Sequence, residues 1–335
     1  MISRSADWKH ALATAVRDPA DLLAELTLPD HLLEGARAAA GEFPLRVPRD
    51  FLARMRQGDP DDPLLRQVLP CAEEDLEVPG FVADPVDDMR ARRGPGVLQK
   101  YCGRALLVVT GACAVHCRYC FRRHFPYGAE NAAQSGFSAA LAWLAEATDI
   151  SEVILSGGDP LMLDDERLAD LIRQLSQIPH LKRLRVHTRV PIVLPGRVTD
   201  GLLAALTGTR LPCVMVVHAN HAREIDNAVA GALQRMHRAG ITLLNQAVLL
   251  AGVNDDVQVL AALSEALFAA EVLPYYLHML DPVQGAAHFA VDDGRALALL
   301  DGLRGVLPGY LVPRLVREIP GADAKMPLTA VEKPD

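Results

Sequence analysis

Three closely spaced cysteines offer the clearest chemistry in this sequence of 335 residues. They are Cys113, Cys117 and Cys120, in the spacing C-x3-C-x2-C. Iron–sulfur clusters are held by cysteine thiolates, and an ordinary electron carrier uses four of them, so that every iron has a protein ligand. Three thiolates leave one iron of a four-iron cluster without such a ligand. The spacing therefore predicts a [4Fe-4S] cluster with an open site where chemistry can occur.

Two other interpretations of this motif are a zinc site and ordinary core thiols. Structural zinc takes four ligands, usually in two separated pairs, and His116 and His124 lie too close to the cysteines for a familiar finger spacing. Core thiols are disfavoured because arginines and histidines make the stretch a polar loop. The isolated cysteines Cys71, Cys102 and Cys213 are interpreted as small buried hydrophobes.

A glycine pair gives the second candidate site, in the run Ser156, Gly157, Gly158, Asp159. Two adjacent glycines let a ligand approach the backbone closely, although a plain turn would have the same composition. Gln246 is a polar interruption of an apolar run, and a buried amide costs free energy unless it is paired. It is either a satisfied core amide or a ligand contact, and we favour the ligand contact.

Lys325 is the third candidate, in the small-residue loop 321–328. A lysine amine is the group that links covalently to pyridoxal 5′-phosphate (PLP). Most lysines, however, are solvated surface residues. Taken alone, Lys325 would be interpreted as one of these, so its assignment depends on the surrounding pattern.

Short apolar runs alternate with amphipathic segments from Arg104 onward, which predicts βα units around a parallel sheet. We expect strands at Arg104–Thr110, Glu152–Ser156, Arg183–Thr188, Cys213–His218, Thr242–Leu250 and Leu273–Met279. We expect helices between them at Phe137–Ala147, Asp165–Gln177, Asp200–Thr207, Ile225–Arg238 and Val257–Ala270. Polar residues follow the strands, and functional residues of βα barrels gather at these strand ends. The predicted fold is therefore α/β, a partial barrel of six βα units.

The first hundred residues have a different character. Residues 6–56 show helical spacing broken by prolines, which predicts small helices, and residues 57–100 are rich in Pro, Asp and Gly, which predicts a long connector. We therefore divide the chain into an N-terminal helical region and connector (1–100), a core barrel (101–315) and a C-terminal segment (316–335) that carries Lys325.

Charge and hydropathy indicate the compartment. A net charge of −8 argues against non-specific nucleic-acid binding. The first ten residues lack the apolar stretch of a signal peptide, and no apolar run approaches the roughly 18 residues of a membrane span. Clustered thiols require a reducing environment. We expect a cytoplasmic enzyme with no membrane partner.

The order of these motifs, CxxxCxxC, SGGDPL, NQ and Lys-x-Pro, resembles the lysine 2,3-aminomutase family of radical S-adenosyl-L-methionine (SAM) enzymes. Longer strings, at Tyr119–Tyr127 and Pro274–Phe289, resemble in particular the branch that serves β-lysylation of bacterial elongation factor P. The resemblance implies a radical SAM type of partial (β/α)6 TIM-like barrel. It also implies three cofactors, which are a [4Fe-4S] cluster, SAM and PLP. The implied reaction converts L-lysine to (R)-β-lysine, with an external electron donor and a functional link to elongation factor P and its lysyl ligase.

The resemblance also implies roles for residues around SAM. Cys113, Cys117 and Cys120 would hold three irons while SAM chelates the fourth. The segment Ser156–Asp159 would bind the SAM amine. His218 and Gln246 match family positions that face SAM.

PLP and substrate have their own implied residues. Lys325 would carry PLP, Arg104 would hold its phosphate, and Tyr101 would lie nearby. Arg122 would pair with the substrate carboxylate, a task suited to a guanidinium group. The substrate ε-ammonium would lie between two further catalytic residues, which are Asp281 and Glu318.

Two features depart from the family members that act on free lysine. Glu318 stands where those members have an aspartate. No cysteine follows Cys213 in this sequence, so we do not expect the zinc-binding cysteines that help those members assemble, and the oligomeric state stays open. The alternative functions are an aminomutase for free lysine or another amino acid in metabolism, a radical SAM methyltransferase, and a non-catalytic iron–sulfur sensor. Lys325 argues against the sensor, and the acidic pair Asp281 and Glu318 argues for a cationic substrate end.

Overall fold

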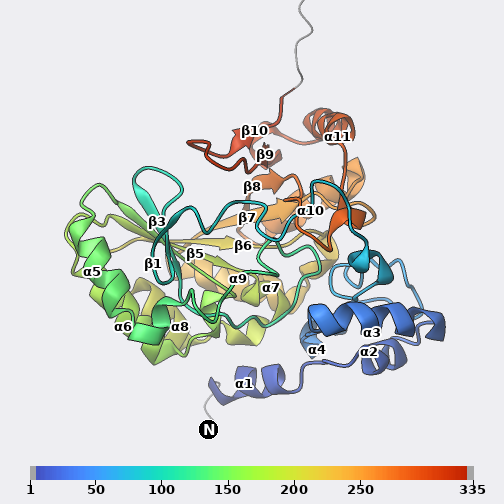
Figure 1. Ribbon diagram of the computed structural model, residues 1–335, viewed down its shortest axis with the longest axis horizontal. Helices are drawn as coiled ribbons and strands as arrows, with labels where there is room; N and C mark the ends of the chain where they lie inside the picture. Colours follow the sequence, from blue (N-terminus) through green and yellow to red (C-terminus); the bar gives the residue numbers. More distant parts are fainter. Residues whose placement is uncertain (1–4, 330–335) are drawn as a thin grey trace, which may run out of the picture.

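The computed structural model describes residues 5–329, and its central feature is one sheet whose ten strands follow each other in chain order. Strands β3 to β9 all run parallel (Figure 1). Their bounds are β3 Arg104–Val108, β4 Glu152–Ser156, β5 Arg183–Thr188, β6 Cys213–Val217, β7 Thr242–Val248, β8 Leu273–His278 and β9 Arg314–Arg317. The order runs linearly from β1 (Arg92–Gly94) to β10 (Met326–Pro327), so the sheet forms an open, partial barrel.

Helices connect the parallel strands and cover the sheet. The main ones are α5 Ser138–Glu146, α6 Asp165–Ser176, α8 Asp200–Thr207, α9 Asn227–Arg238, α10 Val257–Ala269 and α11 Asp293–Val306. In α6 the buried positions Leu168, Leu171 and Leu175 recur at three- and four-residue spacing, so one face packs in the core. None of the helices within the described residues has the length and apolar character needed to cross a membrane.

The α/β fold class and all six predicted strands are confirmed, with ends one or two residues earlier in four of them. The structure adds a seventh parallel strand, β9, which pairs with β8 through Tyr276 and Arg314. The sequence hides this strand because Leu315 and Val316 are its two apolar residues, with an arginine on each side. So short a run gives no period to recognise.

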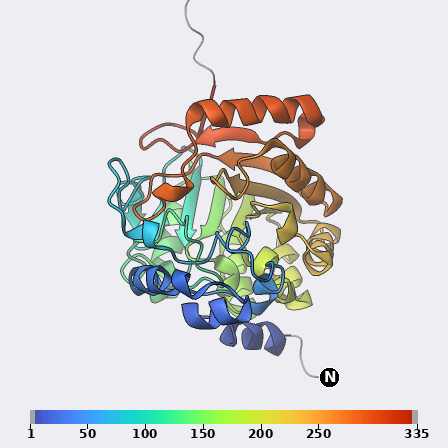
Figure 2. The same ribbon diagram turned by 90° about the vertical axis from the view of Figure 1, so that its right-hand side faces the viewer.

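The small helices predicted for residues 6–56 are present. They are α1 Ser5–Ala13, α2 Pro19–Glu25, α3 Leu33–Glu42 and α4 Arg49–Leu52. Two views show them gathered on one side of the barrel, with α11 on the opposite side (Figures 1 and 2). The N-terminal region is therefore a layer against the barrel.

The connector that follows carries more structure than its composition predicts. It includes a 3-10 helix at Ala72–Asp75, and β1 forms an antiparallel hairpin with β2 (Val97–Leu98). Strand β2 also pairs with β3, so the connector extends the sheet. The division of the chain at residues 100 and 315 remains a proposal, and β9 crosses the second of these positions. Residues 330–335 of the proposed C-terminal segment lie outside the described residues.

The isolated cysteines do not share one environment. Cys213 is buried, Cys71 is half-buried and Cys102 is exposed. The expectation of a buried thiol is therefore wrong for Cys102, which lies in the turn before β3.

Candidate active site

One cavity of about 410 Å³ extends from the strand ends into the barrel. Every predicted site residue contributes to its lining. These residues are Tyr101, Arg104, Cys113, Cys117, Cys120, Arg122, Ser156, Gly157, Gly158, Asp159, His218, Gln246, Asp281, Glu318 and Lys325. The fold thus brings together residues that are more than 200 positions apart in the chain.

The three cysteines of the motif lie in the loop between β3 and α5, at the carboxyl end of β3. Burial raises the pKa of the Cys113 thiol, and charges on Cys120 and Cys117 raise it further. Burial also raises the pKa of Cys120 to about 11, with Cys117 adding to the shift. Negative charge on one thiolate therefore opposes ionisation of its neighbours. Cationic iron would offset this effect, because metals bind the deprotonated thiol.

The connector holds this loop in place. Arg118 is fully buried and donates to Glu74 at 2.7 and 2.6 Å and to the carbonyl oxygen of Phe43 at 2.7 Å. Arg123 donates to the same Glu74 carboxylate at 2.8 Å. A buried ion pair whose atoms are also hydrogen-bonded is costly to break. The N-terminal region therefore fixes the backbone that carries the cysteines.

The glycine pair at the end of β4 packs against the start of the cysteine loop. A Cβ on Gly157 would lie 2.4 Å from the Thr110 carbonyl oxygen, and one on Gly158 would lie 2.4 Å from that of Ala112. Gly158 N–H donates to Thr110 at 2.7 Å. Another group therefore approaches both glycines closely, as the sequence predicts. In this structure that group is the backbone at the start of the cysteine loop, and not a ligand. Contact of this segment with SAM remains a proposal.

Asp159 joins the ends of two strands. Its carboxylate accepts hydrogen bonds from the Thr188 hydroxyl at 2.7 and 2.9 Å and from the backbone N–H of Arg189 at 2.8 Å. Burial raises the pKa of Asp159 to about 6, against the effect of these hydrogen bonds. Its side chain thus fixes the end of β4 to the end of β5.

Lys325 lies at the other side of the cavity, directly before β10, which pairs with β9. Its Nζ is 2.8 Å from Glu318 Oε2, and Tyr101 donates to Glu318 Oε1 at 2.7 Å. Burial opposes the charge on Glu318, but Lys325 and Tyr101 lower its pKa overall. The hairpin of β9 and β10 therefore presents a lysine and a carboxylate as an ion pair in the cavity.

Comparison with known proteins shows the family. Residues 93–188 match the model of a 4Fe-4S single cluster domain. The chain is 50% identical over 324 residues to L-lysine 2,3-aminomutase of Escherichia coli (strain K12), which covers 96% of this chain and 94% of that protein. It is 32% identical over 323 residues to L-lysine 2,3-aminomutase of Clostridium subterminale, covering 96% of this chain and 77% of that protein. The chain belongs to the lysine 2,3-aminomutase family.

This aminomutase is therefore an enzyme of the isomerase class, and its cofactors are a [4Fe-4S] cluster, SAM and PLP. Solved structures that align with part of this chain include a radical SAM methyltransferase from Sphaerobacter thermophilus, at 18% identity and a TM-score of 0.43. That likeness covers 66% of this chain and 68% of the methyltransferase. Streptococcus suis SuiB aligns with a TM-score of 0.48 at 11% identity, over 65% of this chain and 50% of SuiB.

Unpartnered buried atoms in the aminomutase fit the two organic cofactors. Arg104 lies with its guanidinium 4.7 Å from the Tyr101 ring centre, and its Nε is buried without a hydrogen-bond partner among residues 5–329. The buried Nε2 of His218 likewise lacks a partner in this part of the chain. Burial lowers the pKa of His218 to about 4, so the ring is neutral near pH 7. Because buried polar groups are normally paired, these atoms indicate places for a ligand.

The proposed substrate groups differ in their surroundings. Arg122 donates to Asp88 at 2.6 Å and to Ser156 at 3.2 Å, and although burial opposes its charge, Asp88 raises its pKa. The Asp281 side chain has no hydrogen bond or ion pair within residues 5–329, and burial raises its pKa to about 7. Arg122 is therefore already compensated, whereas Asp281 is available to a cation.

Sequence reasoning gave no role to other residues of this cavity. Lys100 lies 2.9 Å from Asp88 and 3.7 Å from Glu318, so it links the two carboxylates. Both Lys100 and Asp88 belong to the connector, where irregular sequence gave no signal. His187 and His278 also line the cavity with buried Nε2 atoms that lack partners in the described chain. Their positions at the ends of β5 and β8 were the available signal.

Proposed function

We propose that this aminomutase converts L-lysine to (R)-β-lysine in the cytoplasm, for attachment to elongation factor P by a lysyl ligase. The observation that carries the proposal is the convergence of Lys325, Asp281 and the three-cysteine loop on one cavity. The relatives' name, L-lysine 2,3-aminomutase, supports lysine as substrate. The strings at Tyr119–Tyr127 and Pro274–Phe289 support the elongation factor branch.

We propose distinct tasks for the residues of this cavity. Cys113, Cys117 and Cys120 hold the cluster, which receives its electron from an external donor, and Ser156–Asp159 with His218 and Gln246 bind SAM. Lys325 anchors PLP, and Arg104 and Tyr101 bind at its phosphate end. When bound, SAM on the reduced cluster supplies radical chemistry, and PLP supplies a π-system that lets the amino group migrate.

The substrate is oriented at its two charged ends in this proposal. Arg122 stays charged beside Asp88 and binds the α-carboxylate, and Asp281 binds the ε-ammonium with Glu318 alongside. Two fixed ends set the position of the β-carbon, and a misplacement of about 1 Å can cost about a hundredfold in rate.

The anchoring role of Lys325 has a direct test. Borohydride reduction of the PLP-loaded enzyme is expected to fix the pyridoxyl group to Lys325, and peptide mapping identifies the residue. Lys325→Ala should lose the visible absorption band of bound PLP. A label on Lys100 or Lys182 would reject the assignment.

The link to elongation factor P is tested by supplying the reaction mixture to purified elongation factor P and its lysyl ligase. We expect a mass increase on the factor that is much faster with the enzyme-treated lysine than with untreated lysine. Synthetic (R)-β-lysine is the positive control. If the treated and untreated mixtures perform alike while β-lysine accumulates, the alternative of a metabolic aminomutase for free lysine is favoured.

A further inference from the structure

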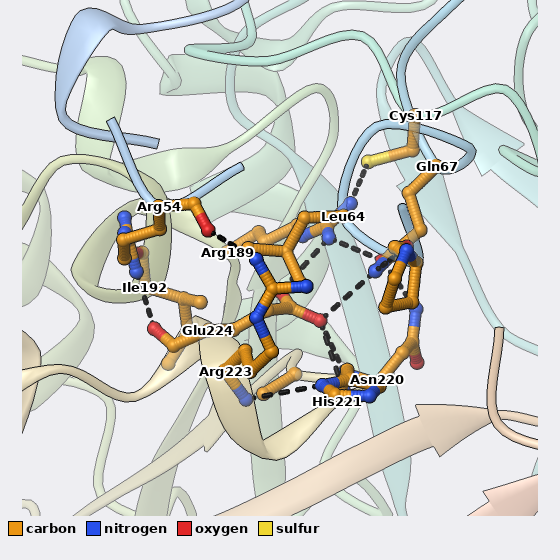
Figure 3. Close-up of polar contacts among 12 residues, drawn as sticks. Arg54, Leu64, Gln67, Cys117, Arg189, Ile192, Asn220, His221, Arg223 and Glu224 are labelled. Atoms are coloured by element: carbon orange, nitrogen blue, oxygen red, sulfur yellow. Dashed lines mark hydrogen bonds and ion pairs between the residues drawn. The ribbon is translucent and has the colours of Figure 1, made fainter. Parts of the chain in front are cut away.

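A buried arginine directly after β5 contacts one of the motif cysteines (Figure 3). Arg189 is 5% exposed, and its Nη1 lies 2.7 Å from Cys117 Sγ. Its Nη2 donates to Gln67 Oε1 at 2.6 Å and to Glu224 Oε2 at 2.9 Å. One guanidinium group therefore joins the cysteine loop, the N-terminal connector and the segment after β6.

The partners of Arg189 are themselves fixed. Glu224 is fully buried, and its Oε1 accepts from the backbone N–H of Asn220 at 2.8 Å and of His221 at 3.0 Å. Gln67 is also fully buried and donates to Glu224 at 3.2 Å and to the Pro63 carbonyl at 3.0 Å. The carboxylate and the amide thus hold one edge of the guanidinium group and direct Nη1 toward the sulfur.

Aromatic rings complete the enclosure of the arginine. The Arg189 guanidinium carbon lies 5.3 Å from the Phe51 ring centre and 5.6 Å from that of Tyr119. Burial between rings reduces screening by water, so the charge acts more strongly on nearby groups. Glu224 contacts Nη2 whereas Cys117 contacts Nη1, so the positive group lies between the carboxylate and the sulfur.

This geometry bears on electron transfer to the cluster. Reduction adds one negative charge to an iron–sulfur cluster, and hydrogen bonds to the ligating sulfurs and nearby positive charge stabilise the reduced form. We propose that Arg189 is a positioning residue that raises the reduction potential of the cluster by donating to Cys117, with Gln67 and Glu224 fixing its orientation. This inference rests on the proposed ligation of the cluster by Cys117.

The test is the reduction potential of the reconstituted cluster, measured by anaerobic potentiometric titration followed by electron paramagnetic resonance. Arg189→Gln removes the charge and is expected to lower the equilibrium constant for reduction at least tenfold, a shift of about 59 mV for one electron. Arg189→Lys keeps the charge but replaces the two guanidinium nitrogens, one on Cys117 and one on Gln67 and Glu224, by a single nitrogen, so a smaller shift of the same sign is expected. An unchanged potential in a fully loaded Arg189→Gln enzyme would overturn the inference.

Arg54→Gln is the matched control. Arg54 belongs to the same network, where it donates to the Ile192 carbonyl at 2.7 Å and to the Glu224 carbonyl, but Cys117 is not among its hydrogen-bond partners in the described part of the chain. We expect the cluster of the Arg54→Gln enzyme to have the same reduction potential as that of the parent. An equal shift in Arg54→Gln and Arg189→Gln would mean that Arg189 acts only through the structure of the network, which would overturn the inference. If the Arg189→Gln enzyme binds no cluster, the Arg189→Lys enzyme provides the test instead. An unchanged reduction potential in the Arg189→Lys enzyme contradicts the proposed hydrogen bond from Arg189 to Cys117.

Failure of this inference can be told from failure of the proposed function. If the parent enzyme binds no cluster, or if Cys117→Ser binds a full one, the proposed ligation is wrong. If the parent binds a cluster that Cys117→Ser loses, and Arg189→Gln leaves the potential unchanged, only the role of Arg189 is wrong.

Discussion

At the scale of single residues, Asp281 is a cavity carboxyl group without a side-chain hydrogen bond or ion pair among residues 5–329. Burial raises its pKa to about 7, while Lys325 opposes and Glu318 adds to the shift. Its folded-state pKa is above the usual value near 3.9, so protonated Asp281 stabilises the fold below about pH 4. That contribution is lost as the pH rises through 7. A bound ammonium group would supply the missing partner and restore the charge to the carboxylate.

The pH dependence of lysine binding follows from this residue. We expect KM for lysine to fall as the pH rises from 6 to 8, by up to about tenfold for each pH unit below 7, because the ammonium group needs an ionised Asp281. Asp281→Asn should raise KM by about a hundredfold or more, since breaking a buried pair costs about 3–5 kcal/mol. Steady-state kinetics over this range provide the measurement.

The variant also separates substrate binding from other effects. Asp281→Asn should flatten the dependence of KM on pH while SAM and PLP binding stay close to those of the parent. A variant that keeps the parent's pH dependence would show that another group recognises the ammonium.

At the scale of elements, the packing of the β4 end against the cysteine loop sets where the cluster lies. Gly158→Ala places a Cβ 2.4 Å from the Ala112 carbonyl oxygen, so the loop must move. We expect a loss of about 1–3 kcal/mol in the free energy of unfolding, as for other overpacked sites, and reduced iron content. Chemical denaturation and iron analysis after anaerobic reconstitution measure both effects.

Gly128→Ala is the control for this variant. A Cβ at Gly128 meets no atom of the described residues within 4 Å, and this glycine lies in the same segment between β3 and α5. It should keep the stability and iron content of the parent. Equal losses in the two variants would mean that close packing at the β4 end is not what positions the cluster.

Sequence patterns predict this fold best where elements are long and periodic. The six predicted strands and the helices between them follow from apolar runs, and the strand-end rule places residues such as His218 and Asp281 in one region. Strand β9 and the hairpin of β1 and β2 are too short to give a recognisable apolar run. Asp88 and Lys100 join the site through the irregular connector, whose path depends on tertiary contacts. The places of the site residues at the strand ends were therefore predictable from the sequence, but their hydrogen-bond and ion-pair partners were not.

At the scale of the whole molecule, buried ion pairs join the N-terminal region to the barrel. Asp62 is fully buried, accepts backbone hydrogen bonds from Leu64 at 2.9 Å and Leu65 at 3.1 Å, and lies 2.5 Å from Arg223. Arg223 follows β6, so this pair links residues 161 positions apart. The N-terminal region thus stabilises the segment that also contains Glu224.

Asp62→Ala tests this coupling. Loss of the carboxylate leaves buried N–H groups without a partner and Arg223 without its carboxylate, so we expect a loss of about 3–5 kcal/mol in the free energy of unfolding. Limited proteolysis should cut the first hundred residues faster than in the parent. The surface variant Asp61→Ala, at an exposed neighbour in the sequence, should change neither property. Parent-like stability of Asp62→Ala would contradict the proposed coupling.

The most direct test of the whole account is the product formed from lysine. The enzyme, reconstituted anaerobically with iron, sulfide, SAM and PLP and then reduced, is incubated with L-lysine, and the amino acids are resolved by chiral chromatography. We predict (R)-β-lysine in amounts well above the SAM consumed, and none from an enzyme with serine at Cys113, Cys117 and Cys120. A fully loaded enzyme that cleaves SAM but returns lysine unchanged would contradict the account.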